Sequence, residues 1–422
     1  MNRTAARLRA LPLAVLASVV ATVVVVRLRT KPPAQASTET TAASATSGES
    51  ATGLAARLVA PPLPASAMVT KGAPRMIHGA PTHAHRASAR GPAAPKVGFR
   101  VPVGDRVAAQ VTASPDEKTL YAATLGGDVV ALARDDGARR WSVALGDRVY
   151  STPLVGDDGT VYVGTDAKKL VAIAPDGAVR WRLELAGEVD TGATFGKDGT
   201  IVVAAGREVV SVRRGGDVAW SFSAKDKVFT APAIKPDGLV VVGSQDDHVY
   251  AIGPGGQLAW AVDLGADVDG AAAIADDGAV YVGTDKGEVV RLGPKGQIAW
   301  RTPVGGFVRG VLSVARNGDV LAGTYGPVPR LVRVTPEGAV RGAFAIRGTG
   351  AREFGIHGGP LEDEAGVLWF GAQDDVVRGI GPDGVERFRY EAKGDVDGPV
   401  SMLSDGSLVV GSEDGTVTLL LP

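Results

Sequence analysis

The 422-residue sequence predicts an all-β protein, an eight-bladed β-propeller of four-stranded antiparallel blades. Two observations lead to this fold class. A unit of about 40 residues recurs along the chain, and inside each unit short valine-rich segments alternate with Asp-Gly or Gly-Gly turns. The 57 glycines favour many tight turns, and no part of the repeat region keeps a helical period.

A tryptophan on the expected outer strand marks most repeats. Five copies carry it, at intervals of 39 or 40 residues: Trp141, Trp181, Trp220, Trp260 and Trp300. Three degenerate copies have Phe99, Gly342 and Phe388 at the same position. An indole that recurs once per blade buries about 200 Å² against its neighbour. We therefore interpret the five tryptophans as packing residues rather than as a ligand cage.

Each repeat shows the period of two that is typical of strands. In the second blade Val161–Val163 and Leu170–Ile173 are predicted strands, after an inner strand over Tyr150–Val155. The intervening turns contain Asp158-Gly159 and Asp176-Gly177, which supply the positive φ of two-residue hairpins. The outer, tryptophan-bearing strand completes the four.

The two ends of the repeat region predict how the ring closes. The last repeat stops after its third strand, at Thr416–Leu421, whereas a lone outer strand, residues 97–103, precedes the first inner strand. Pairing these pieces completes blade eight and leaves no strand unpaired. The propeller is therefore expected to span residues 97–422.

Residues 1–31 form a targeting segment, for which two interpretations stay open. An apolar run at residues 11–26 lies between Arg9 and Arg27, as in an uncleaved signal-anchor. A cleaved signal peptide is the alternative, with Ala34-Gln35-Ala36 as the peptidase site. Either way we expect an extracytoplasmic, periplasmic-side protein, anchored to the inner membrane by residues 11–26 or secreted if the signal is cleaved.

Residues 32–96 are rich in Pro, Ala, Ser and Thr and show no periodicity, which predicts a disordered linker. The linker contains His78, His83 and His85, which we expect to be solvated tail residues.

The two parts of the chain carry opposite net charges. Residues 1–96 have 12 Lys/Arg and 2 Asp/Glu, and residues 97–422 have 33 Lys/Arg and 44 Asp/Glu. An acidic domain of this kind argues against binding to a phosphate backbone, so we expect no nucleic-acid partner.

The repeats resemble the pyrroloquinoline-quinone (PQQ)-type propeller family over residues 97–422. The matching motifs are VYVGTD (161–166), LVAIAPDGAVRW (170–181), VYAIGPGGQLAW (249–260) and YVGTDKGEVVRLGPKGQIAW (281–300). The resemblance implies a propeller like that of the outer-membrane barrel-assembly lipoprotein. The dehydrogenase branch of the family carries Thr-Gly-Lys-Glu before each tryptophan, a cysteine pair at the quinone and long calcium-binding insertions. This chain has no Cys and near-minimal blades. We therefore expect neither PQQ nor calcium as cofactor, no metal site and no catalytic residues.

Candidate ligand-binding residues are those that open the inner strands, because inner strands line the central channel. In a repeat protein the positions that a blade needs for packing recur in every repeat, whereas positions that can serve a ligand vary from repeat to repeat. Counting back from each turn glycine, blades two to eight place there Tyr150, Asp190, Phe229, Asp269, Arg309, His357 and Asp397. Blade one has Ala108 or Ala109. An irregular loop at residues 347–354 precedes His357. These residues predict a half-polar, half-aromatic rim; the alternative is a solvated funnel in which Arg309 pairs with Asp269.

Two classes of function remain. The first is a non-catalytic, membrane-tethered and monomeric propeller that binds a protein, peptide or envelope ligand, with outer-membrane protein assembly as one such role. The second is a quinone- or metal-dependent oxidoreductase with a reduced site. Addition of the quinone with calcium, followed by absorbance, distinguishes the two.

Overall fold

The structure is a computed structural model that describes residues 72–422. The predicted targeting segment and residues 32–71 of the predicted linker lie outside the described residues. Among residues 72–422, no helix has the length and apolar character needed to cross a membrane.

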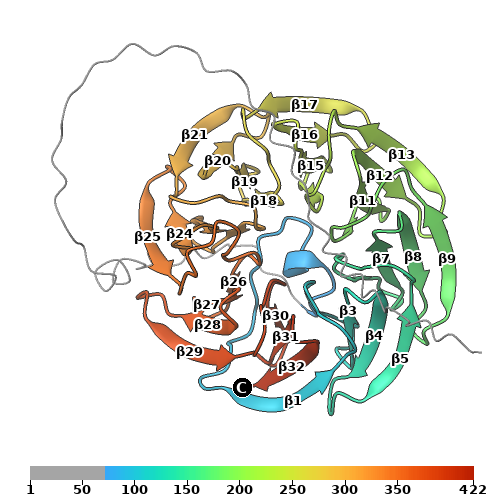
Figure 1. Cartoon of the computed structure of the whole chain (residues 1–422). Coiled ribbons are helices and arrows are strands. Elements are labelled where there is room, and N and C mark those ends of the chain that lie inside the picture. The colour runs from blue at the N-terminus through green and yellow to red at the C-terminus, as the bar shows by residue number, and fades with distance from the viewer. Residues whose placement is uncertain (1–71) are drawn as a thin grey trace, which may run out of the picture. The chain divides into compact units, whose positions relative to one another are not determined.

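Eight four-stranded antiparallel sheets are arranged around a central channel, which confirms the predicted propeller (Figure 1). The innermost strands have only two residues each: β2 (Thr112–Ala113), β6 (Leu154–Val155), β10 (Thr194–Phe195), β14 (Ala233–Ile234), β18 (Ala273–Ile274), β22 (Ser313–Val314), β26 (Leu361–Glu362) and β30 (Ser401–Met402). The second strands are β3 (Thr119–Ala123), β7 (Val161–Thr165), β11 (Ile201–Ala205), β15 (Val240–Gly243), β19 (Val280–Gly283), β23 (Val320–Gly323), β27 (Leu368–Gly371) and β31 (Leu408–Ser412).

The two outer layers are longer and follow in the same order. The third strands are β4 (Asp128–Ala133), β8 (Lys169–Ile173), β12 (Glu208–Val212), β16 (His248–Ile252), β20 (Glu288–Leu292), β24 (Arg330–Val334), β28 (Val376–Ile380) and β32 (Thr416–Leu421). The outermost are β5 (Arg139–Ala144), β9 (Val179–Glu184), β13 (Val218–Ser223), β17 (Leu258–Asp263), β21 (Ile298–Pro303), β25 (Val340–Ala345), β29 (Glu386–Glu391) and β1 (Lys96–Pro102).

Ring closure is as predicted. β1 pairs antiparallel with β32, with Arg100 opposite Thr418 and Val101 opposite Val417. The final sheet has the order β1-β32-β31-β30, so the first strand of the chain completes the last blade. The apolar core lies between neighbouring blades; Phe99 and Val101, for example, pack with side chains of blades one and eight.

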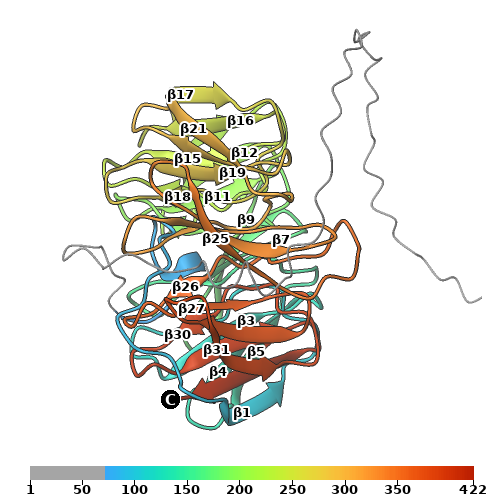
Figure 2. The same ribbon diagram turned by 90° about the vertical axis from the view of Figure 1, so that its left-hand side faces the viewer.

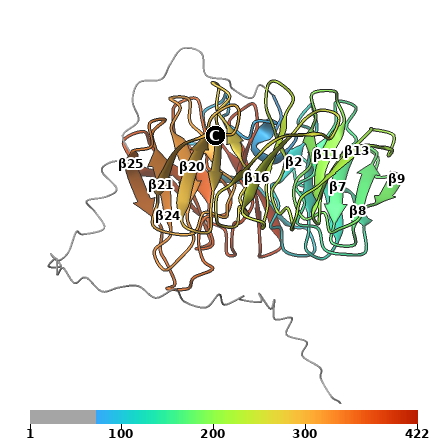
Figure 3. The same ribbon diagram turned by 90° about the horizontal axis from the view of Figure 1, so that it is seen from above.

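The N-terminal boundary of the folded domain differs from the prediction. Residues 72–91, which we call the plug, are packed against the propeller and are not a disordered linker. They include the short 3-10 helix η1 (Ile77–Gly79), which lies in the central channel in Figure 1 and toward one face of the disc in Figures 2 and 3. His78, His83 and His85 are at most 2% exposed, so the expectation of solvated tail histidines is wrong.

Hydrogen bonds to the inner strands explain why the plug is ordered. The last residue of six inner strands donates its backbone N–H to a plug carbonyl over 2.7–3.2 Å. The pairs are Ala113 with Pro74, Val155 with Arg75, Ile234 with Pro81, Ile274 with Thr82, Val314 with Ala84, and Glu362 with His85. A two-residue strand would otherwise present these amides unpaired to the channel.

Candidate ligand-binding cavity

Buried valines determine which side chains point into the channel. The residue before each predicted rim residue is buried; Val189 and Val268, for instance, have no exposed surface. Val268 donates its N–H to Ser244 O of the preceding blade, and its side chain occupies the space beside Gly243. Because successive side chains alternate in an extended segment, the next residue, Asp269, is directed to the channel. The same geometry repeats around the ring.

All seven predicted rim residues line one cavity of about 540 Å³. They are Tyr150, Asp190, Phe229, Asp269, Arg309, His357 and Asp397, and both candidate positions of blade one, Ala108 and Ala109, line it as well. The hydrogen-bonded inner strands begin several residues later than predicted, at Leu154 in blade two, so the rim lies on the approach to the strands.

Arg309 is held on the wall of the cavity by two carboxylates. Its Nε and Nη2 donate to the two oxygens of Asp285 at 2.8 and 2.6 Å, and its Nη1 pairs with Glu353. The expected alternative partner, Asp269, is not the residue that it binds. The Arg309 guanidinium also lies 5.3 Å from the centre of the Phe307 ring, which Arg352 approaches to 4.5 Å. The irregular loop over 347–354 thereby contributes Glu353 to the cavity.

His357 is connected to a tyrosine that the sequence did not single out. The Tyr325 hydroxyl and His357 Nδ1 are 2.7 Å apart and share a hydrogen bond. Burial raises the pKa of Tyr325 well above its usual range, and Asp397 adds to the shift. The imidazole itself is exposed. It therefore offers its free edge to a ligand while the tyrosine fixes its orientation.

Crowded carboxylates give the cavity its electrostatic character. Burial, a hydrogen bond to Asp166 and the nearby charge of Asp166 raise the pKa of Asp190 to about 7. Burial and Asp397 raise the pKa of Asp395 to about 7, and burial and Asp269 raise that of Asp267 to about 6. One carboxylate oxygen each of Asp190, Asp269 and Asp397 is enclosed with no hydrogen-bond partner in the described structure. A positive charge or a proton would relieve this repulsion.

Asp267, Asp269 and Asp285 bring carboxylate oxygens within 4.8 Å of one another. Both oxygens of Asp285 are already bonded to Arg309, whose guanidinium supplies the positive charge at this point. The donor set is therefore occupied by a cation of the protein itself. We assign no metal to it.

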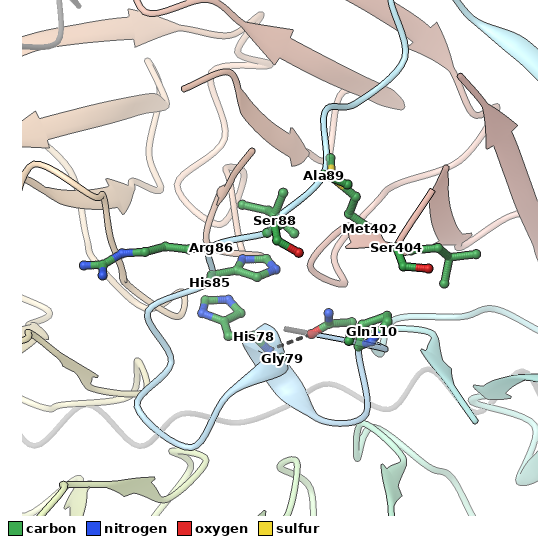
Figure 4. Close-up of a pocket in the computed structure, with 14 residues that line it drawn as sticks. His78, Gly79, His85, Arg86, Ser88, Ala89, Gln110, Met402 and Ser404 are labelled. Atoms are coloured by element: carbon green, nitrogen blue, oxygen red, sulfur yellow. Dashed lines mark hydrogen bonds between the residues drawn. The ribbon is translucent and has the colours of Figure 1, made fainter. Parts of the chain in front are cut away.

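The plug forms the floor of the cavity, which the sequence analysis did not foresee. Ile77 lines the cavity and packs with Ala231, Ala271 and Val311 of blades four to six. Behind it His78 and His85 stack beside Gln110 in a second, water-sized pocket of about 20 Å³ (Figure 4). Gln110 Oε1 accepts the His78 backbone N–H at 2.9 Å. Ile77 lines the larger cavity, whereas His78 and His85 line the smaller pocket.

The five repeated tryptophans lie away from the channel, on the outer strands. Each indole covers the turn glycine of the following blade: Trp141 lies against Gly177 and Trp300 against Gly338. Those glycines have φ of +90° and +93°, and an added Cβ would approach the ring to 2.9 Å. Nε1 of Trp141 and of Trp300 donates to the carbonyl of Pro175 and of Pro336 at 2.8 Å. These are contacts between blades.

A protein-family model described as outer membrane protein assembly factor BamB matches residues 96–174, 167–253 and 245–333. The overlapping matches cover more than half of the chain. The chain belongs to this family. The family resemblance inferred from the repeat motifs is thereby confirmed.

Solved structures show the same fold. BamB from Moraxella catarrhalis superposes with a TM-score of 0.61 at 19% identity, over 78% of this chain and 97% of that one. The computationally designed Ika8 protein superposes with a TM-score of 0.61 at 15% identity, over 78% of this chain and 99% of that one. The search of curated proteins finds no match. At these identities the two structures show the propeller fold alone.

Proposed function

We propose that this protein is a non-catalytic binding scaffold that holds a protein or peptide partner at the channel mouth, in the assembly of outer-membrane proteins. The family supports the assembly role, because its model is that of an assembly factor. The propeller is proposed to act on the periplasmic side, exported and tethered through residues 11–26, as a monomer and without PQQ or calcium.

The observation that carries the proposal is the cavity itself. About 540 Å³ of space is lined by residues of all eight blades, with aromatic or charged side chains from blades two to eight, next to a loop that adds Glu353. Pockets that bind ligands combine apolar walls with a few placed polar groups. Tyr150 is 39% exposed at the rim and offers an apolar contact surface.

The charge of the cavity favours a cationic segment of the partner. Asp190, Asp269 and Asp397 each have an enclosed carboxylate oxygen without a partner, whereas Arg309 is committed to Asp285 and Glu353. A lysine or arginine side chain entering the cavity would place a positive charge beside these carboxylates and offset the burial and the Asp166 charge that raise the pKa of Asp190. The excess of acidic over basic side chains in residues 97–422 also attracts a cationic partner, over a longer range.

The test combines partner capture with a defined probe. Replacing Asp269, Arg309, His357 and Asp397 together by Ala should abolish capture of envelope proteins from detergent extracts. It should also abolish binding of a fluorescent lysine-rich peptide, while circular dichroism shows an intact fold.

The control variant replaces Arg182 and Glu184, both exposed on outer strand β9, by Ala. It should leave partner capture and peptide binding unchanged. A glutamate-rich peptide of equal length should not bind. Unchanged capture by the quadruple variant would place the binding surface elsewhere on the propeller.

A further inference from the structure

The plug is held in an unusual backbone conformation by three histidines. His78, His83 and His85 have φ of +53°, +56° and +53°, the left-handed region that residues other than glycine adopt in only about a few per cent of cases. All three rings are buried. The rings of His78 and His85 stack with centroids 4.0 Å apart and planes 8° apart, and His83 meets His78 edge-on at 6.0 Å.

The pocket around these rings is built for neutral imidazoles. His83 Nδ1 faces Ala272 O at 3.0 Å, and His78 Nδ1 faces His83 O at 3.2 Å. The Nε2 atoms of His78 and His83 are enclosed and have no partner among the described residues. His85 has Gly359 O and Val400 O at 3.0 and 3.2 Å from its two ring nitrogens. A positive charge on His78 or His85 would lie directly against the stacked imidazole of the other residue.

The charged groups that pack nearby are engaged with one another. Arg86 binds Asp276 and the carbonyls of Val314 and Ala315, and Arg316 pairs with Glu362. The largest influences on the three rings are burial, the neighbouring imidazoles and backbone carbonyls of blades five to eight. No carboxylate is among them, so a protonated histidine would gain no ion pair in this pocket.

We propose that residues 72–91 are a proton-released plug: neutral His78, His83 and His85 keep it seated across six blades, and their protonation frees it and removes the floor of the cavity. The consequence for binding rests on the proposed function of the cavity. Release of the plug itself does not.

The sign of the effect follows from burial. Burial lowers the pKa of His83 and of His85 to about 4, and lowers that of His78 well below its usual value. The released plug takes up protons near pH 6.5 and the seated plug near pH 4, so acidification through this window favours release. At pH 5 each histidine with a seated pKa of about 4 raises the release equilibrium about 30-fold over its value at pH 8.

Whole-molecule melting would not isolate this effect. The raised pKa values of Asp190, Asp267 and Asp395 mean that the folded cavity holds protons that the unfolded chain loses, which favours the folded state at acid pH. The histidines and the cavity carboxylates therefore act on global stability with opposite signs. The measurement has to be local.

Hydrogen–deuterium exchange of the full chain supplies a local measurement. The amides of Ile234, Ile274 and Val314, which donate to plug carbonyls, should lose protection about 30-fold at pH 5 if one histidine is titrated. With two titrated the loss should reach about 1,000-fold, after correction for the intrinsic pH dependence of exchange. Amides between second and third strands, such as that of Val282, serve as the internal reference. Equal protection of the plug-bonded amides at pH 8 and pH 5 would overturn the proposal.

Two sets of variants separate release from a general effect of acid. Asparagine tolerates the left-handed region and does not titrate, so the triple variant His78→Asn, His83→Asn, His85→Asn should keep its protection at pH 5. His248→Asn, on β16 beside Asp246 and outside the plug, is the matched control and should respond like the parent. A triple variant as sensitive to acid as the parent would overturn the proposal.

A covalent lock provides a test that does not depend on the histidine variants. A Cβ built on Gly192 lies 3.3 Å from the Ile77 Cβ, near disulfide distance, and the chain has no other cysteine. Oxidised Ile77→Cys/Gly192→Cys should stay protected at pH 5, and reduction should restore the acid response. If the oxidised form exchanged at pH 5 like the reduced form, plug release would not be the event that acid causes. Because no ligand is present, this result is independent of whether the cavity binds a partner.

Discussion

At the scale of single residues, glycines repeatedly leave the space that a tryptophan ring fills. Trp220 lies over Gly256, and in blade seven the buried Trp369 fills the space beside Gly91 and Gly379. Trp369 is 2% exposed and its Nε1 donates to Asp363 at 3.1 Å, whereas Trp220 is only partly buried. The repeated and the unique tryptophan therefore differ in what their removal would cost.

Trp369→Ala should lower the free energy of unfolding by about 3–5 kcal/mol, because it removes a large buried side chain and leaves a cavity. Trp220→Ala should cost about 1–2 kcal/mol, since part of its indole is already in water. Urea denaturation with unchanged m-values would measure both. Similar losses in the two variants would show that exposure does not distinguish them.

Asp190→Asn tests the electrostatics of the cavity. With a pKa of about 7, the folded protein keeps a proton on Asp190 that the unfolded chain loses near pH 4. The contribution of this group to the free energy of unfolding therefore falls as pH rises from about 4 to 7. The variant should be more stable than the parent by about 1–2 kcal/mol at pH 8, allowing for solvent screening, and nearly equal at pH 4.

Melting temperatures of parent and variant at the two pH values would show this difference. Asp136→Asn is the control, because its exposed side chain caps the Ala138 N–H in a way that asparagine can retain. A variant that gains nothing at pH 8 would mean that Asp190 ionises without cost in the folded protein.

At the scale of elements, the blades were predictable from the sequence and the plug was not. Strands such as Val161–Thr165 follow from alternation and Asp-Gly turns, and counting residues from those turns located all seven rim side chains. Residues 72–91 have no period because their order depends on amides of distant inner strands and on left-handed histidines. Tyr325 and Ile77 reach the cavity from outside the counted position, so a repeat alignment had no means of finding them.

Shortening the chain should reveal the contribution of the plug. A chain that begins at residue 92 loses six carbonyl acceptors and the Ile77 contacts with blades four to six. At about 0.5–1.5 kcal/mol for each hydrogen bond, less the entropy of ordering the plug, we expect a loss of about 3 kcal/mol and a melting temperature lower by roughly 4 °C. A chain that begins at residue 72 is the control. Identical melting of the two would show that the plug adds nothing to stability.

At the scale of the whole molecule, the ring depends on one pair of strands. Within residues 72–422, β1 and β32 are the only strand pair that joins the start of the propeller to its end, and their pairing completes the last blade. The plug crosses six blades but forms no blade of its own. Loss of the β1–β32 pair should therefore disrupt cooperative folding, whereas loss of the plug should only lower the free energy of unfolding.

Removing residues 416–422 should abolish cooperative folding, because β1 then has no partner and blade eight retains only β30 and β31. Removing Pro422 alone is the control and should leave the melting curve unchanged. Calorimetry and size-exclusion chromatography would distinguish a closed monomer from an open, associating chain. A sharp transition in the truncated protein would show that the ring tolerates an open blade.

The pairing of Arg100 with Thr418 joins residues that are made at opposite ends of translation. At 5–20 residues per second, the ribosome needs roughly 15–60 s after β1 to produce β32. Throughout that time β1 has no partner strand, and the fold cannot be completed however stable its individual blades are. The speed of synthesis, as much as the final free energy, therefore sets how long this protein is exposed to proteases and to aggregation.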